Sequence, residues 1–223
     1  MCWGEITLAH GDKKMDVSEA ISKRCSIRKW KDKGVEKEVL LKVLEAGRRA
    51  PSWANVQPWR FIIVQDKKKL KELAIAAGGQ ETVSSAPVVI VACAVPNDFS
   101  KSAERRAIKD LIDTGAVPWL TEEILDDVLL QDEVHSPHLL GKEVMTMRAR
   151  EQVNIAMAYM TLEAVNQGLG SLWVGSIKLQ EVLSALAIPE DVVPHAYLVL
   201  GYADEKPSPR PRKALESILV WEI

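Results

Sequence analysis

Apolar and polar positions follow one another along the chain in patterns that predict both helices and strands. Residues 36–50 carry apolar side chains at helical spacing, and Pro51 ends this helix because the residue before a proline is disfavoured in helical geometry. Residues 61–64 combine aromatic and β-branched side chains, which is typical of a strand. The uninterrupted apolar run over residues 88–94 predicts another strand, covered on both faces.

The rest of the chain continues this mixture without an internal repeat. Residues 97–147 are mostly helical and more polar in pattern, with breaks at Gly115, Pro118 and Ser136. The last residues form an apolar, strand-like segment behind a proline-rich arm. Further helices are expected over residues 16–23, 66–77, 142–167 and 179–186, and further strands over residues 171–176 and 196–201. This order predicts a single α+β domain over residues 1–223, with a central sheet covered by helices.

Composition excludes some partners. The formal net charge of −2 gives no electrostatic reason to expect nucleic acid or an anionic membrane. No segment approaches the ~20 apolar residues that span a bilayer, and the amino terminus lacks the pattern of a signal peptide. Cys2, Cys25 and Cys93 lie far apart, which fits reduced thiols better than a disulfide framework. We therefore expect a cytoplasmic protein.

Basic residues surround a serine in the stretch RCSIR, at Arg24, Ser26 and Arg28. If the backbone is extended, alternate side chains point the same way, so two guanidinium groups and a hydroxyl could bind a phosphate or a carboxylate. The alternative is a solvated basic turn whose arginines pair with surface carboxylates. Taken alone, the motif favours the solvated turn.

The loop PSWANVQPW offers a second set of polar groups. Ser52, Asn55 and Gln57 can all hydrogen-bond at short range, and the two amides both donate and accept, as the edges of a heterocycle do. The structural alternative is a helix-to-strand connection that is fixed by its prolines and packed by its tryptophans. Taken alone, the loop favours this alternative.

Two further stretches could contact a ligand. Arg210 and Arg212 lie on a stiff proline-rich arm, although such a run is usually a solvated tail. In GLGSLWVGS the glycines stand between a helix and a strand, the reverse of a dinucleotide-binding turn. This stretch can still supply backbone amides near Val174 and Gly175.

The histidines do not predict a metal site or a catalytic triad. His135 and His138 are separated by Ser136 and Pro137, which prevents one helix from presenting both to a metal. No hydrolase nucleophile motif stands out.

Four motifs in order span nearly the whole chain: RxSxR, PSxxNxQPW, GLGSxWxG, and LGYxxExPxPRPR followed by LxxxxxWE. Together they resemble the FMN-dependent nitroreductase family. The resemblance implies a nitroreductase-like α+β sandwich with a mostly antiparallel sheet, in a domain-swapped homodimer with FMN at the subunit interface. It also implies a ping-pong reaction, in which NAD(P)H reduces the flavin and a nitroaromatic, quinone or similar flat acceptor then takes the electrons.

The same resemblance assigns residues to the flavin, by backbone or side chain. No catalytic side chain is assigned, because the cofactor carries the redox chemistry. The residues expected to hold the ribityl phosphate and the pyrimidine side are Arg24, Cys25, Ser26 and Arg28, with Arg210 and Arg212 on the phosphate. Val174 and Gly175 would offer amides near the flavin N5. The second subunit would contribute Pro51, Ser52, Trp53 and Asn55.

Two features depart from the family pattern. Trp53 occupies a position that is usually small, and residues 97–147, the expected lid or insert over the active site, match no subgroup. Trp119, Leu139 and Leu140 are candidates for lining this lid, with core packing as the favoured explanation.

Other functions remain open within the resemblance. The chain could be a flavin-binding module, or it could belong to a branch that dehalogenates iodotyrosine or fragments the flavin. Dehalogenation would need a lid tyrosine, and residues 97–147 contain none.

Overall fold

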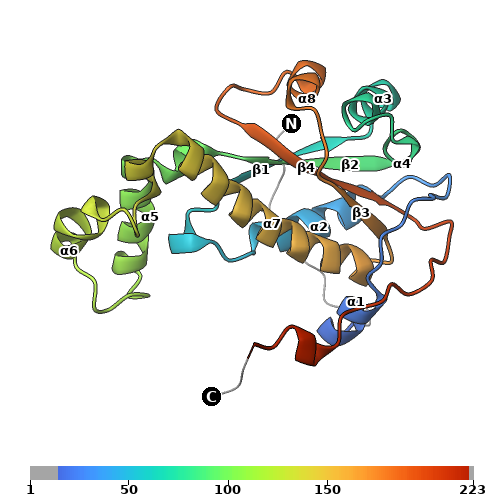
Figure 1. Ribbon diagram of the computed structural model, residues 1–223. Helices are drawn as coiled ribbons and strands as arrows, with labels where there is room; N and C mark the ends of the chain where they lie inside the picture. Colours follow the sequence, from blue (N-terminus) through green and yellow to red (C-terminus); the bar gives the residue numbers. More distant parts are fainter. Residues whose placement is uncertain (1–14, 221–223) are drawn as a thin grey trace.

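The centre of the molecule is a four-stranded antiparallel sheet, seen in a computed structural model that describes residues 15–220 (Figure 1). The strand order is β1-β2-β4-β3, with antiparallel pairing at every step. The strands are β1 (Trp59–Val64), β2 (Val88–Ala94), β3 (Gly170–Val174) and β4 (Val193–Gly201). The expected α+β fold is confirmed.

Helices cover both faces of this sheet. On one face lie α2 (Lys37–Arg48) and α7 (Lys142–Asn166), and on the other lie α3 (Lys67–Ala76) and α8 (Leu179–Leu186) (Figure 1). The remaining helical segments are α1 (Val17–Lys23), α4 (Glu81–Ser84), α5 (Lys101–Asp113), α6 (Glu122–Asp127) and the 3-10 turns η1 (Trp53–Asn55), η2 (Pro96–Phe99), η3 (Leu129–Gln131), η4 (Pro137–Leu140) and η5 (Leu215–Ser217). No helix within residues 15–220 is long and apolar enough to cross a membrane.

Strand β2 shows why the apolar run over residues 88–94 predicted a strand covered on both faces. All of its residues are buried, and alternate side chains enter different cores. Ile90 and Ala92 pack with α2 and α7, whereas Val89 and Val91 pack with α3 and α8. An exposed face would have required alternate polar positions.

Two helix starts follow the expected caps. Asp16 accepts a hydrogen bond from the Ser18 amide at 2.6 Å, and Asp66 accepts one from the Lys69 amide at 2.9 Å. At the other end of a helix, Gly168 follows α7 with a φ of +75°, a conformation that glycine adopts without strain. These ends were correctly predicted from single residues.

Strand β3 ends at Val174 rather than at Ser176. Two further expectations at strand ends were wrong. Strand β4 begins at Val193 rather than at Ala196 and includes Pro194, which cannot donate to a neighbouring strand. Pro194 lies opposite Cys93, next to a register shift in the pairing, where a missing donor is tolerated.

The second error concerns the carboxyl-terminal segment, which was expected to be strand-like. Within the described residues, Leu215–Ser217 forms a 3-10 turn on an exposed arm. No sheet edge is recorded against this arm, and a strand needs a neighbour to satisfy its backbone groups. Residues 221–223 lie outside the described part of the chain.

Helices α5 and α6 extend to one side of the sheet, away from its other helices (Figure 1). We call residues 101–141 the outer region. It has a small apolar core of its own, made by Ile108, Leu120, Leu125 and Leu130. The expected core packing of the lid candidates is not seen, because Trp119 is 68% exposed and Leu139 and Leu140 are also exposed.

Candidate functional site

The RCSIR loop lies along the edge strand β3. Ser26 forms a parallel bridge with Ser171, and the Ile27 amide donates to the Ser171 carbonyl oxygen at 3.0 Å. Gly170 makes this approach possible, since a Cβ there would lie 2.6 Å from Ile27 Cγ1. The glycine of the GLGS stretch is thus needed for packing the basic loop against the strand.

The other side of the same loop is held by the segment that follows β4. The amides of Arg28 and Lys29 both donate to the Glu205 carboxylate. The Asp204 amide donates to the Lys29 carbonyl oxygen at 2.9 Å. Arg210 and Arg212 follow a few residues later along the chain.

Four arginines of the candidate site have no carboxylate partner within residues 15–220: Arg24, Arg28, Arg210 and Arg212. The recorded side-chain bonds of Arg28 and Arg212 go to backbone carbonyls, at 3.5 Å to Ser26 and 3.1 Å to Pro211. A solvated basic turn would have paired such charges with carboxylates. Unpaired guanidinium groups instead suit a phosphate.

The opposite end of β3 is open. Gly175 is exposed, and a Cβ built on it would meet nothing within 4 Å. Ser171 and Gly175 are separated by about 13 Å, at roughly 3.3 Å a residue. This span is longer than a five-carbon chain alone, but arginine side chains reach out from the basic loop and a flavin ring has a width of its own, so the residues present fit FMN.

The loop 51–57 lies elsewhere in the same chain. The Trp53 amide donates to Gln152 Oε1 at 2.9 Å, whereas the start of α1 contacts α7 through Asn166. These two positions on α7 are about 21 Å apart, at 1.5 Å a residue. The structure therefore places residues 24–28 along β3, whereas loop 51–57 is held against α7 at Gln152.

The loop 51–57 is nevertheless built with strain. Ala54, Asn55 and Gln57 have φ values of +43°, +57° and +49°, which non-glycine residues rarely adopt. The Ser52 hydroxyl accepts from the Gln57 amide at 2.9 Å, and Trp53 packs on Phe99 with ring centroids 5.9 Å apart. Such strain is typical of loops that present groups to a ligand.

Two cysteines lie in different environments. Cys25 is half-buried in the basic loop, and Cys93 is buried in β2, where burial raises the pKa of its thiol to about 12. Only Cys25 is therefore placed where it could contact a ligand. Cys2 lies outside the described residues.

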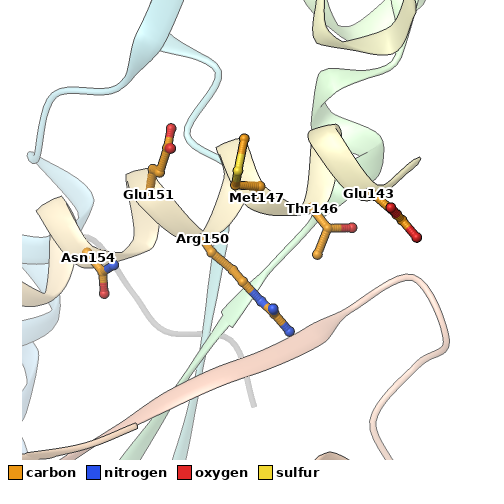
Figure 2. Close-up of a pocket in the computed structure, with 6 residues that line it drawn as sticks. All are labelled: Glu143, Thr146, Met147, Arg150, Glu151 and Asn154. Carbon is orange, nitrogen blue, oxygen red and sulfur yellow. The ribbon is translucent and has the colours of Figure 1, made fainter. Parts of the chain in front are cut away.

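A polar cluster that sequence reasoning missed lies between α7 and the start of β4. His195 Nε2 and Asn154 Oδ1 are 2.9 Å apart, and Arg150 lines the same cavity. Figure 2 shows Arg150 extending from α7 toward the strand, while Glu151 points to the opposite side. The spacing of Arg150 and Asn154 on one helix was visible in the sequence, but their approach to His195 was not.

A second missed feature is the buried carboxyl of Glu104. Its Oε2 lies 2.7 Å from His138 Nδ1, while His135 pairs with Asp132 at the same distance. Burial raises the pKa of Glu104, against the hydrogen bond from His138. The two histidines thus contact different carboxylates.

A basic loop on the edge of an antiparallel sheet, with helices over both faces, describes an α+β protein. A sequence profile of the Nitroreductase family matches residues 21–202, and the chain belongs to this family. A protein named NADH dehydrogenase from Thermus thermophilus is 31% identical over 207 residues, covering 93% of this chain and 96% of the relative.

Two further comparisons agree. A protein from Bacillus subtilis named FMN reductase [NAD(P)H] is 30% identical over 205 residues, which cover 91% of this chain and 72% of the relative. The crystal structure of a nitroreductase-like protein from Streptococcus mutans superposes with a TM-score of 0.76 at 21% identity, over 92% of this chain and 97% of that one. At that identity the structural match speaks for the fold alone.

Proposed function

We propose that this protein is an FMN-dependent oxidoreductase that takes hydride from NAD(P)H and passes electrons to a flat acceptor such as a nitroaromatic or a quinone. One observation carries the proposal: the basic loop 24–28 lies along β3, with unpaired arginines at one end and the open Gly175 at the other. The Thermus relative is named for NADH and the Bacillus relative for both FMN and NAD(P)H, which supports this cofactor and this donor.

The residues divide into two tasks. Arg24, Arg28, Arg210 and Arg212 bind the phosphate, and the Ser26 hydroxyl donates to it or to the ribityl chain. The backbone at Val174 and Gly175 orients the ring, with room for it beside Gly175. When bound, FMN supplies the hydride acceptance and electron donation that no side chain here can supply.

The proposal includes a homodimer in which loop 51–55 of one subunit completes the site of the other. Within one chain loop 51–57 is held at Gln152 of α7, whereas Met15, just before α1, is held at Asn166, about 21 Å away along the helix. The carboxyl-terminal arm also exposes Leu215, Ile218 and Leu219 at 59–63%, which a second copy could cover.

The test is an anaerobic titration of the purified protein with FMN and then with NADH or NADPH. We expect bound flavin whose absorbance bleaches with the nucleotide and returns when a quinone or nitroaromatic is added. Arg24→Ala is expected to weaken FMN binding by about 10- to 100-fold, the usual effect of losing a hydrogen bond to a charged group. Arg49→Ala, which removes a surface arginine paired with Glu45 at 2.6 Å, is the matched control.

Several outcomes would contradict the proposal. Protein that rejects FMN would end it. Protein that binds FMN but transfers no electrons from NAD(P)H to any acceptor would instead be a flavin-binding module. Product analysis showing dehalogenation or flavin fragmentation would assign the specialised branches.

Mixed dimers test the shared site separately. With Arg24→Ala in one subunit and Asn55→Ala in the other, a site built from two subunits leaves one site intact, so about half of the wild-type flavin should bind. If each site came from one chain, both sites would be damaged and neither would recover.

A further inference from the structure

A pocket of ≈ 470 Å³ lies between α7, the end of β3 and the start of β4. Its lining includes the apolar side chains of Trp173 and Pro194 and the polar side chains of Arg150, Asn154 and His195. None of the described residues that line it is acidic. The pocket therefore combines an aromatic ring with one cation.

The guanidinium group of Arg150 carries a hydrogen-bond donor without a partner in this pocket. Its Nε is buried and has no hydrogen-bond partner within residues 15–220, and no ion pair is recorded there for its guanidinium. The nearby Glu151 pairs with Arg148 at 3.3 Å and extends from α7 on the opposite side to Arg150 (Figure 2). A buried unsatisfied donor destabilises the protein unless a ligand accepts from it.

Among the described residues that line this pocket, Arg150 carries the only charge at neutral pH, whereas Glu143 and Glu151 line an adjoining pocket with it. Burial, and secondly the charge of Arg150, lower the pKa of His195, so its imidazole is neutral. His195 and Asn154 are hydrogen-bonded to each other at 2.9 Å, which holds both side chains in place. Trp173 is held likewise, because its indole Nε1 donates to Thr161 Oγ1 at 2.7 Å.

We propose that Arg150, supported by Asn154 and His195, binds the carboxylate of a flat aromatic acid whose ring lies against Trp173 and Pro194. A guanidinium group binds a carboxylate through two parallel hydrogen bonds, which a neutral group of the same shape cannot replace. Gly175 lines this pocket and also the proposed flavin site. This inference rests on the proposed function, and it makes aromatic acids the preferred acceptors.

The acceptor reaction has a simple balance. NADH supplies a hydride, and with one proton from water it reduces the nitro group of 4-nitrobenzoate to nitroso, releasing NAD⁺ and water. The carboxylate takes no part in this bond breaking. Its contribution is therefore to binding and orientation alone.

The experiment compares 4-nitrobenzoate with the uncharged 4-nitrobenzamide in wild-type protein and in Arg150→Met and Arg150→Lys. Dissociation constants are measured by calorimetry on the protein as purified, without NADH, and kcat/KM is measured separately with NADH. Arg150→Met is expected to weaken the binding of 4-nitrobenzoate by about 10- to 100-fold and that of 4-nitrobenzamide by less than about twofold. Arg150→Lys should fall between wild type and Arg150→Met, because it keeps the charge but loses the fork.

Arg148→Met is the matched control, since it removes an arginine from the same helix outside the pocket and should leave both probes unchanged. Equal effects of Arg150→Met on both probes, or none on either, would overturn the inference. If Arg150→Met weakened the binding of 4-nitrobenzoate alone and the wild type reduced neither probe with NADH, the carboxylate site would be upheld. That result would count against the proposed function instead. Thermal unfolding of each variant separates loss of binding from loss of folding.

Discussion

The sheet with its covering helices and the outer region are stabilised by different forces. The sheet places a fully buried β2 between two apolar cores, so burial of apolar surface dominates there. The outer region buries four apolar side chains in its own core and adds ion pairs at its surface. Exposed ion pairs contribute little, so the outer region should open at a lower free energy than the sheet.

This difference in stability between the sheet and the outer region bears on the proposed function. The proposed flavin residues 24–28 and 174–175 lie on the sheet, where packing fixes their positions. The outer region contacts the other proposed half-site, because Trp53 packs both on the main core and on the outer core. A rigid part therefore holds the cofactor residues, and a less stable part adjoins the loop that would reach the second subunit.

The largest expected effect comes from comparing one leucine in each core. Leu198→Ala in β4 and Leu125→Ala in α6 both remove a side chain with 0% exposure. Leu198→Ala is expected to lower the global free energy of unfolding by about 2–5 kcal/mol. Leu125→Ala should mainly accelerate local opening, seen as faster hydrogen exchange in α5 and α6, with a smaller change in the urea midpoint. Equal shifts of the urea midpoint would show that the two parts unfold as one unit.

An intermediate effect is expected from Glu104→Gln, through its dependence on pH. Burial raises the pKa of Glu104 above its ordinary value of 4.5, so between the two values the native state binds more protons than the unfolded state. The free energy of unfolding of the wild type should therefore fall as pH rises through this window, relative to Glu104→Gln, which does not titrate.

Urea unfolding of both proteins at about pH 4.5 and about pH 8 measures this difference. Glu123→Gln, at an exposed position of α6, is the control for removing a carboxylate from the outer region. If the free energy of unfolding of the wild type rose with pH relative to that of Glu104→Gln, the raised pKa of Glu104 would be contradicted. The contact with His138 would then outweigh burial.

The smallest expected effect is that of Arg105→Met. Arg105 pairs with Asp126 at 2.7 Å and with Glu122 at 3.1 Å, but all three side chains are well exposed. Its loss should lower stability by at most about 1 kcal/mol and speed hydrogen exchange in α6 without changing that of β2. Arg106→Met is the control, as Arg106 makes no ion pair within the described residues. Exchange that changes equally in α6 and β2 would argue against separate stabilities.

The sequence predicted much of the fold because many signals are local. Helix α8 was predicted over the residues it occupies, and β2 was recognised from its uninterrupted apolar run. The prediction missed the start of β4, where the register shift that tolerates Pro194 depends on the opposite strand. The carboxyl-terminal segment has strand-forming residues, but its geometry depends on a neighbour that no local pattern specifies.

The candidate site was also predicted only in part from the sequence. The basic motif and the GLGS stretch were recognised from the sequence, but their contact through Ser26 and Ser171 joins residues 145 positions apart. The same holds for the Glu104–His138 pair and for the pocket of Arg150 and His195. Nothing in the local pattern around either histidine indicates its partner.

The sequence by itself determined the element types, the family and the residue types available for a phosphate. The tertiary structure decided which of these residues meet: it set the basic loop on β3 through the missing side chain of Gly170, and it separated loop 51–57 along α7. It also left Arg150 with an unpaired buried donor. The physical reason is that propensity and periodicity act over a few residues, whereas contacts and burial depend on how distant segments pack.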